Sequence, residues 1–181
     1  MPRYIALLRA INVGGHVVKM DRLRALFEEL KLRRVETLIA SGNVLFDSAS
    51  RDGDALERRI ERRLADALGF EVATFVRTPA ELAGVVAYQP FDDAAPLEPG
   101  LDLWVGFLKA PPPAPVAAAL LALGSDTDAL HVRGRELYWQ RRTRNMQMLG
   151  LGARLERALR APMTMRNVTT VRKLAERAPP S

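Results

Sequence analysis

The sequence contains no cysteine, which excludes disulfide frameworks, cysteine-ligated metal centres and thiol catalysis. It also lacks long apolar runs, and no segment approaches the roughly 20 apolar residues that a membrane-spanning helix needs. The short apolar stretch at residues 4–8 is interrupted by Arg9, which is atypical of a secretory signal. We therefore expect a soluble, cytoplasmic protein without a membrane partner.

Lysine is scarce as well, because only four of the 27 basic residues are lysines. Arginine therefore supplies most of a formal net charge of +6 and a pI near 10.3. A guanidinium group binds phosphate through a planar fork and keeps its charge, so the basic balance favours an anionic partner. A genomic bias toward arginine on a solvated surface is the alternative interpretation.

The spacing of the arginines separates these two interpretations. One predicted helix alternates basic and acidic residues, namely Arg58, Arg59, Arg62 and Arg63 with Glu57, Glu61 and Asp66. We interpret this face as solvent-exposed and crossed by ion pairs. Other arginines have no acid beside them in the sequence and are better anion-binding candidates: Arg9, Arg141, Arg142, Arg144 and Arg166.

The first half of the chain predicts the order strand, helix, strand, strand, helix, strand. The strands are expected at residues 4–10, 35–40, 44–46 and 71–77, and the helices at about 20–30 and 54–69. Asp54 and Glu57 resemble a capping box at the start of the second helix. This order is typical of a split βαβ, or ferredoxin-like, domain. Thr78, Pro79 and Glu81 then predict the start of a further short helix.

The second half repeats the pattern, although residue identity between the halves is negligible. We expect strands at 101–108, 129–132 and 136–140, with helices at about 116–123, 151–159 and 168–177. This half is expected to close with the last helix rather than with a strand. The chain is therefore predicted to be an α+β protein of duplicated ferredoxin-like halves with antiparallel sheets. The predicted boundaries are 1–89, a linker at 90–100, 101–177, and a disordered tail at 178–181.

Three polar stretches interrupt the apolar elements at turns and supply the candidate ligand-binding residues. These residues are Arg9, Asn12, Gly14, Gly15, Ser41, Gly42, Asn43, Arg166, Asn167 and Thr170. Each stretch also has a structural explanation, such as a glycine in a tight turn or Asn167 capping a helix. The glycines match neither a dinucleotide fingerprint nor a Walker loop, so no cofactor is predicted.

Taken together, these stretches resemble a bacterial family known as "domain of unknown function 1697". The resemblance rests on residues 4–9 and 11–15, Lys19–Met20, Leu23, residues 41–44 with Phe46, Pro90–Phe91, and residues 166–167 with 170–171 and 173–174. It implies a duplicated ferredoxin-like arrangement and no established activity. The chain departs from the family pattern at three positions: Ala10 replaces a usual glycine, Ala40 a usual glutamine, and Val168 a usual aromatic residue.

The candidate residues are donors suited to an anion, and none is a carboxylate or imidazole placed for acid–base catalysis. His16 and His131 lie in different halves, and two ligands are too few for a zinc site, so no metal is predicted. The favoured function is therefore binding of a phosphate-bearing or other anionic small ligand. Two alternatives stay open: binding of single-stranded RNA or DNA through a basic sheet face, with Trp104, Tyr138 and Trp139 as stacking residues, and an enzyme of unknown reaction.

Overall fold

The computed structural model describes residues 1–12, 17–38, 42–91, 103–141 and 148–180. The chain divides into two compact units. The first unit comprises Met1–Gly84 with Lys173–Ser181, and the second comprises Val85–Arg172. Most of the predicted linker at 90–100 lies outside the described residues. None of the described helices is both long and apolar enough to cross a membrane.

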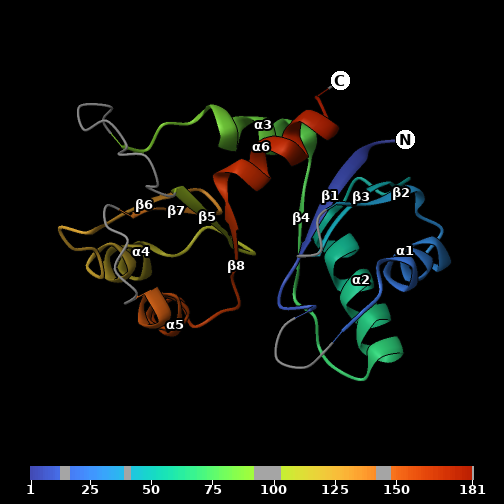
Figure 1. Cartoon of the computed structure of the whole chain (residues 1–181), viewed down its shortest axis with the longest axis horizontal. Helices are drawn as coiled ribbons and strands as arrows, with labels where there is room; N and C mark the ends of the chain where they lie inside the picture. Colours follow the sequence, from blue (N-terminus) through green and yellow to red (C-terminus); the bar gives the residue numbers. More distant parts are fainter. Residues whose placement is uncertain (13–16, 39–41, 92–102, 142–147, 181) are drawn as a thin grey trace. The chain divides into compact units, whose positions relative to one another are not determined.

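The first unit has the predicted split βαβ order (Figure 1). Its elements are β1 (Arg3–Leu8), α1 (Met20–Glu29), β2 (Arg33–Leu38), β3 (Asn43–Asp47), α2 (Gly53–Leu68) and β4 (Thr74–Arg77). The strands form one sheet, sheet A, in the order β2-β3-β1-β4 with antiparallel neighbours. Helix α3 (Pro79–Ala87) follows β4.

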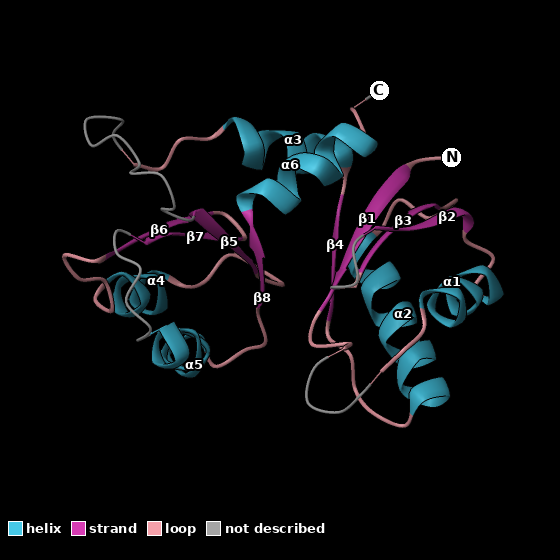
Figure 2. Ribbon diagram, viewed as in Figure 1, coloured by secondary structure: helices cyan, strands magenta, loops and turns pink. Residues whose placement is uncertain are grey.

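Strand β1 is buried on both faces, which explains its continuous apolar sequence. Tyr4, Ala6 and Leu8 pack in the core beneath α1 and α2, together with Phe27 and Ile60. Figure 2 shows these two helices on the same side of sheet A. The opposite face of the sheet carries further buried residues, which are Ile5, Leu7, Leu45, Phe75 and Arg77. Alternate β1 residues therefore contribute to different faces of the sheet.

The second unit repeats this topology. Its elements are β5 (Leu103–Phe107), α4 (Ala114–Leu121), β6 (Asp128–Arg133), β7 (Glu136–Arg141), α5 (Met148–Leu159) and β8 (Thr164–Asn167), followed by α6 (Val168–Arg177). Its sheet, sheet B, has the order β6-β7-β5-β8. The duplicated ferredoxin-like fold is thus confirmed, as two separate four-stranded sheets. The expectation that this half closes with a helix was wrong, because the four-residue strand β8 is too short to show a period.

The two units place a buried arginine at equivalent sites. Arg77 pairs with Ile5 across β4 and β1, and Arg166 pairs with Val105 across β8 and β5. In both cases Nη1 donates to the carbonyl oxygen of the preceding residue, at 2.9 Å in Arg77 and 2.8 Å in Arg166. The duplication is therefore visible in backbone pairing and side-chain contacts where sequence identity is absent.

The helix starts confirm one sequence prediction and correct another. At α3, Thr78 Oγ1 accepts from the Glu81 N–H at 3.2 Å, and Glu81 accepts from the Thr78 N–H at 2.8 Å, so the predicted capping box forms. At α2, the predicted box of Asp54 and Glu57 is wrong. The cap is Asp52, whose side chain accepts from Ala55 N at 2.9 Å.

Glu57 and Glu61 instead accept hydrogen bonds from backbone N–H groups at the outer edge of sheet A. Strand β4 has β1 on one side only, so its outward N–H groups need other acceptors. Glu57 accepts from Val76 N at 2.7 Å and Glu61 accepts from Thr74 N at 2.8 Å. Four residues of helix rise about 6 Å and two residues of strand about 7 Å, so the two spacings match. These bonds attach α2 to the sheet and block the edge against strand addition.

We expect the substitution Glu57→Ala to lower the free energy of unfolding by about 1–3 kcal/mol, because the buried Val76 N–H loses its acceptor. Glu57→Gln keeps an acceptor oxygen and costs less. Urea denaturation measures both effects. Asp66→Ala, on the exposed face of the same helix, is the control and stays within about 0.5 kcal/mol of the parent. A loss no larger than that of the control contradicts this role for Glu57.

An ionic network on β2 holds the C-terminal half of α6 in the first unit. Glu36 accepts from Arg177 Nε at 2.9 Å and from Arg3 Nη2 at 2.7 Å, and Arg3 also pairs with Asp47 at 3.1 Å. Burial by itself raises the pKa of Glu36. The hydrogen bond and charge of Arg177, with help from Arg3, outweigh burial, so the pKa lies below its ordinary value of 4.5.

The lowered pKa predicts how the network depends on pH. Because the carboxyl binds its proton more weakly in the folded than in the unfolded chain, Glu36 stabilises the fold above pH 4.5, and this contribution is lost as the pH falls through the folded pKa. The parent should therefore exceed Glu36→Gln in unfolding free energy at pH 7, and the difference should become smaller at a pH well below 4.5. Urea titrations at the two pH values test this. A difference that is as large in acid contradicts it.

Candidate functional site

Two of the three candidate stretches meet at one end of sheet A. The backbone N–H of Leu8, at the end of β1, donates to the Gly42 carbonyl at 2.7 Å. Gly42 has φ +78°, and a Cβ at this position would lie 2.7 Å from Ile11 Cγ2 and 3.0 Å from Leu8 Cβ. The segment 9–12 is thereby held against the start of β3. We name residues 9–12 with 42–43 the β1-end site.

Arg9 is the charged member of the β1-end site. Its side chain is half-buried, and its backbone N–H donates to the Ala73 carbonyl at 2.8 Å, which extends the pairing of β1 with β4. The sequence has no acidic residue between Met1 and Asp21, or between Thr37 and Phe46. The two segments that form this site therefore bring a guanidinium group and no carboxylate.

The two asparagines of the β1-end site have structural bonds. Asn12 Oδ1 accepts from Val18 N at 2.8 Å, so it ties the start of its loop to the residues before α1. Asn43 is 1% exposed, and its Nδ2 donates to the Leu38 carbonyl at 3.0 Å across the hairpin. The predicted ligand-binding residues Gly14, Gly15 and Ser41 lie outside the described residues.

Ala10 stands at a position where the family resemblance leads us to expect a glycine. Its φ is +54°, in the left-handed region, where a Cβ costs roughly 1–2 kcal/mol and glycine is favoured. The loop backbone therefore keeps the shape that suits glycine although the residue is alanine. Left-handed residues also occur in loops whose successive N–H groups converge on an anion.

The third candidate stretch belongs to the second unit. Arg166 is 6% exposed, and Nη1 donates to Thr164 Oγ1 and to the Met165 carbonyl, both at 2.8 Å. Burial lowers the pKa of this guanidinium to about 10. Asn167 accepts from Thr169 N at 2.9 Å and caps α6, and Thr170 lies half-buried in the first turn of that helix. The prediction that Asn167 caps this helix is thus confirmed.

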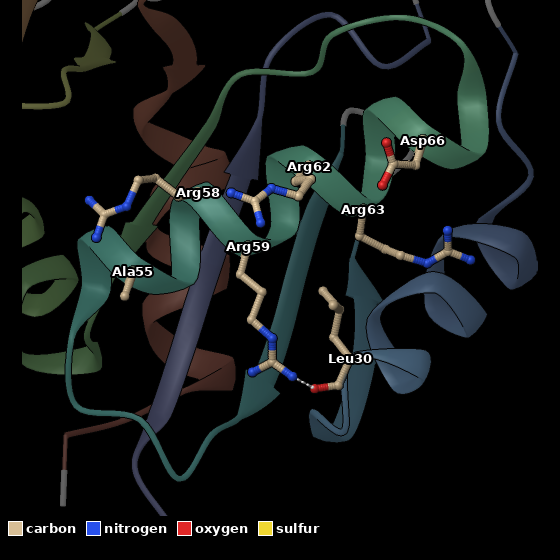
Figure 3. Close-up of a pocket in the computed structure, with 7 residues that line it drawn as sticks. All are labelled: Leu30, Ala55, Arg58, Arg59, Arg62, Arg63 and Asp66. Atoms are coloured by element: carbon tan, nitrogen blue, oxygen red, sulfur yellow. Dashed lines mark hydrogen bonds between the residues drawn. The ribbon is translucent and has the colours of Figure 1, made fainter.

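A groove beside α2 is lined by the arginines that we interpreted from the sequence as a solvent-exposed face crossed by ion pairs (Figure 3). It has a volume of about 400 Å³ and is lined by Leu30, Ala55, Arg58, Arg59, Arg62, Arg63 and Asp66. In Figure 3, Arg59 and Arg63 extend toward α1, whereas Arg58 and Arg62 extend away from it. We name this surface the α2 groove.

The predicted face is exposed at Arg58, Arg59 and Arg62 and is crossed by an ion pair at Arg63, but two of its acids lie elsewhere than the pattern indicates. Glu57 and Glu61 do not alternate with the arginines on the surface, because their carboxylates bind the backbone of β4. Among the four groove arginines, Arg63 pairs with Glu29 of α1, and Arg59 donates to the Leu30 carbonyl. Helical spacing alone cannot distinguish an acid that meets a neighbouring arginine from one that meets a strand edge.

A second feature that the sequence reasoning missed is an aromatic cluster in the second unit. Tyr88 Oη lies 2.8 Å from His131 Nε2, and the Arg133 guanidinium lies 4.1 Å from the centre of the Tyr88 ring. The Tyr138 ring packs against Tyr88 at 5.3 Å, and burial raises the pKa of Tyr138. These residues are 43 or more positions apart from Tyr88, so no local motif signals them. Within the described residues, no three acidic or histidine side chains group as metal ligands.

Gly42→Ala should destabilise the fold more than Gly69→Ala. Both glycines have φ +78°, so both variants incur left-handed strain of about 1–2 kcal/mol. Only at position 42 does the new methyl group also overlap Ile11 and Leu8, which adds about 1–3 kcal/mol, whereas nothing lies within 4 Å at position 69. Chemical denaturation of the two variants measures the difference. Equal losses would show that the contact with Ile11 is not tight.

Comparisons with known proteins agree with this architecture. A family model described as "Protein of unknown function (DUF1697)" matches residues 1–138. The solved structure of the conserved bacterial protein SP0830 from Streptococcus pneumoniae is similar over 97% of both chains, with a TM-score of 0.75 and 22% sequence identity. The comparison with curated proteins gave no match. Because the family model covers well over half of the chain, the protein belongs to the DUF1697 family of unknown function.

Proposed function

We propose that this protein binds a phosphate-bearing or other anionic small ligand at the β1-end site, with Arg9 as the charged contact. The observation that supports this proposal is the meeting of two sequence-distant polar stretches at one strand end, through the Leu8–Gly42 hydrogen bond. The two segments contribute one guanidinium and no carboxylate, which favours an anion over a cation.

The roles of the remaining site residues follow from their bonds. Asn12 Oδ1 and Asn43 Nδ2 shape the two segments, because these atoms bind backbone groups of their own unit. Gly42 permits the close approach of the two segments. Specific binding therefore depends on Arg9 together with backbone N–H groups of residues 10–12, which are suitable donors for phosphate oxygens.

The alternative of single-stranded RNA or DNA binding through a basic sheet face gains no support from two of its three stacking candidates, whereas the third, Trp104, is half-buried. Tyr138 is 2% exposed and Trp139 is 4% exposed, so these rings cannot stack on bases without unpacking. Trp139 Nε1 also donates to Asp128 at 2.8 Å, which satisfies the polar atom of the ring inside the unit. We therefore retain the small anionic ligand as the proposed function.

A thermal-shift series with Arg9→Gln tests the proposal. Inorganic phosphate, adenosine monophosphate and glucose 6-phosphate are the probes, and we expect at least one to raise the Tm of the parent in proportion to ligand concentration. Arg9→Gln should lower the apparent affinity calculated from this Tm rise by tenfold or more, since a charge-assisted contact contributes about 1.5–3 kcal/mol.

The control variant is Arg157→Gln, an exposed arginine on α5 that makes the same change in net charge. It should keep the full Tm rise. The proposal fails if none of the probes stabilises the parent, or if Arg9→Gln and Arg157→Gln respond alike. Urea denaturation of Arg9→Gln without ligand shows whether the variant retains its fold.

A further inference from the structure

The α2 groove concentrates positive charge because of how the helix packs. Helix α2 carries equal numbers of acidic and basic residues between Asp54 and Asp66, so its sequence is formally neutral. Glu57 is 4% exposed and Glu61 is half-buried, and both carboxylates point to β4. The acids of α2 that stay exposed are Asp54 and Asp66, against four arginines. The outer face of α2 is therefore net positive.

The four guanidinium groups are compensated only in part. Arg63 has a carboxylate partner in Glu29, which Arg22 also contacts at 3.5 Å. Arg59 binds a carbonyl oxygen, which orients the guanidinium but leaves its charge unneutralised. Within the described part of the chain, Arg58 and Arg62 make no ion pair or side-chain hydrogen bond. The groove is thus lined by two guanidinium groups that are bonded to the protein, Arg59 and Arg63, and by two that are not bonded to any described residue, Arg58 and Arg62 (Figure 3).

From this arrangement we infer that the α2 groove binds the phosphate backbone of a nucleic acid strand. Arg58 and Arg62, like Arg59 and Arg63, are four residues apart, which places each pair about 6 Å apart along the helix axis. Each strand of a DNA duplex carries one charge per about 3.4 Å of helix axis, so long, flexible arginine side chains about 6 Å apart can each reach a phosphate of the same strand. The site is separate from the β1-end site.

The exposure of the groove favours a polyanion over a small ligand. Pockets for small molecules enclose most of the ligand surface and are mainly apolar, whereas three of the four groove arginines are exposed. A single exposed contact contributes little, but a strand that meets several guanidinium groups releases a counterion at each phosphate. The groove contains no aromatic side chain to stack on bases, so binding is expected to be independent of sequence.

The test measures binding of the full chain to a fluorescein-labelled single-stranded oligothymidylate by anisotropy, between about 50 mM and about 200 mM salt. The parent should bind at the lower salt, with log K falling linearly against log salt. Because each phosphate contact on a single strand contributes about 0.7 to the slope, Arg58→Gln/Arg62→Gln should reduce its magnitude by about 1.4.

The matched control is Arg154→Gln/Arg157→Gln, which removes two exposed arginines from α5 in the second unit. It should keep the slope of the parent. The inference is overturned if the parent does not bind at low salt, if the α2 variant keeps the parent slope, or if both double variants lose slope equally, which indicates bulk charge. Since Arg9 is unchanged, the phosphate response in the thermal-shift series should persist in the α2 variant, so the two proposals fail independently.

Discussion

The hydrogen bonds from β4 to Glu57 and Glu61 are the interaction on which the first unit depends most. A ferredoxin-like sheet leaves an edge strand with unpaired N–H groups, and exposed edges of this kind invite pairing with other chains. Here two carboxylates from one helix satisfy the outward N–H groups of Thr74 and Val76. The same two bonds attach α2 to the sheet, close the edge and remove two negative charges from the helix surface.

This use of acidic residues connects packing with charge. Surface ion pairs contribute little to stability, whereas buried N–H groups without an acceptor are costly, so the carboxylates contribute more at the strand than beside the arginines. The consequence is a formally neutral helix with a positive outer face. A positive surface can thus arise because the backbone N–H groups of a sheet edge bind the acidic side chains of the neighbouring helix.

The end of β1 and the strand β2 contribute to the structure of this unit in different ways. At the end of β1, Gly42 and the left-handed Ala10 give the backbone a specific loop shape, and Asn12 and Asn43 hold it with side-chain bonds. At β2, Glu36 joins Arg3 and Arg177, which holds the C-terminal part of α6 in the unit although it is more than 130 residues away in sequence. The residues of the polar stretches therefore include some that fix the loop conformation and others that are candidates for ligand contact.

The sequence by itself determined the element order of the first half, the duplicated pattern and the family, because apolar periodicity, caps such as Thr78 with Glu81, and turn residues such as Gly42 act locally. It did not reveal β8, the equivalence of Arg77 and Arg166, or the contact of Tyr88 with His131, since these depend on strand pairing between distant segments. Nor did it reveal the direction of Glu57 and Glu61. Helical spacing places an acid near an arginine, but only the tertiary structure brings an unsatisfied strand edge within reach, and the buried N–H groups then decide where the carboxylates go.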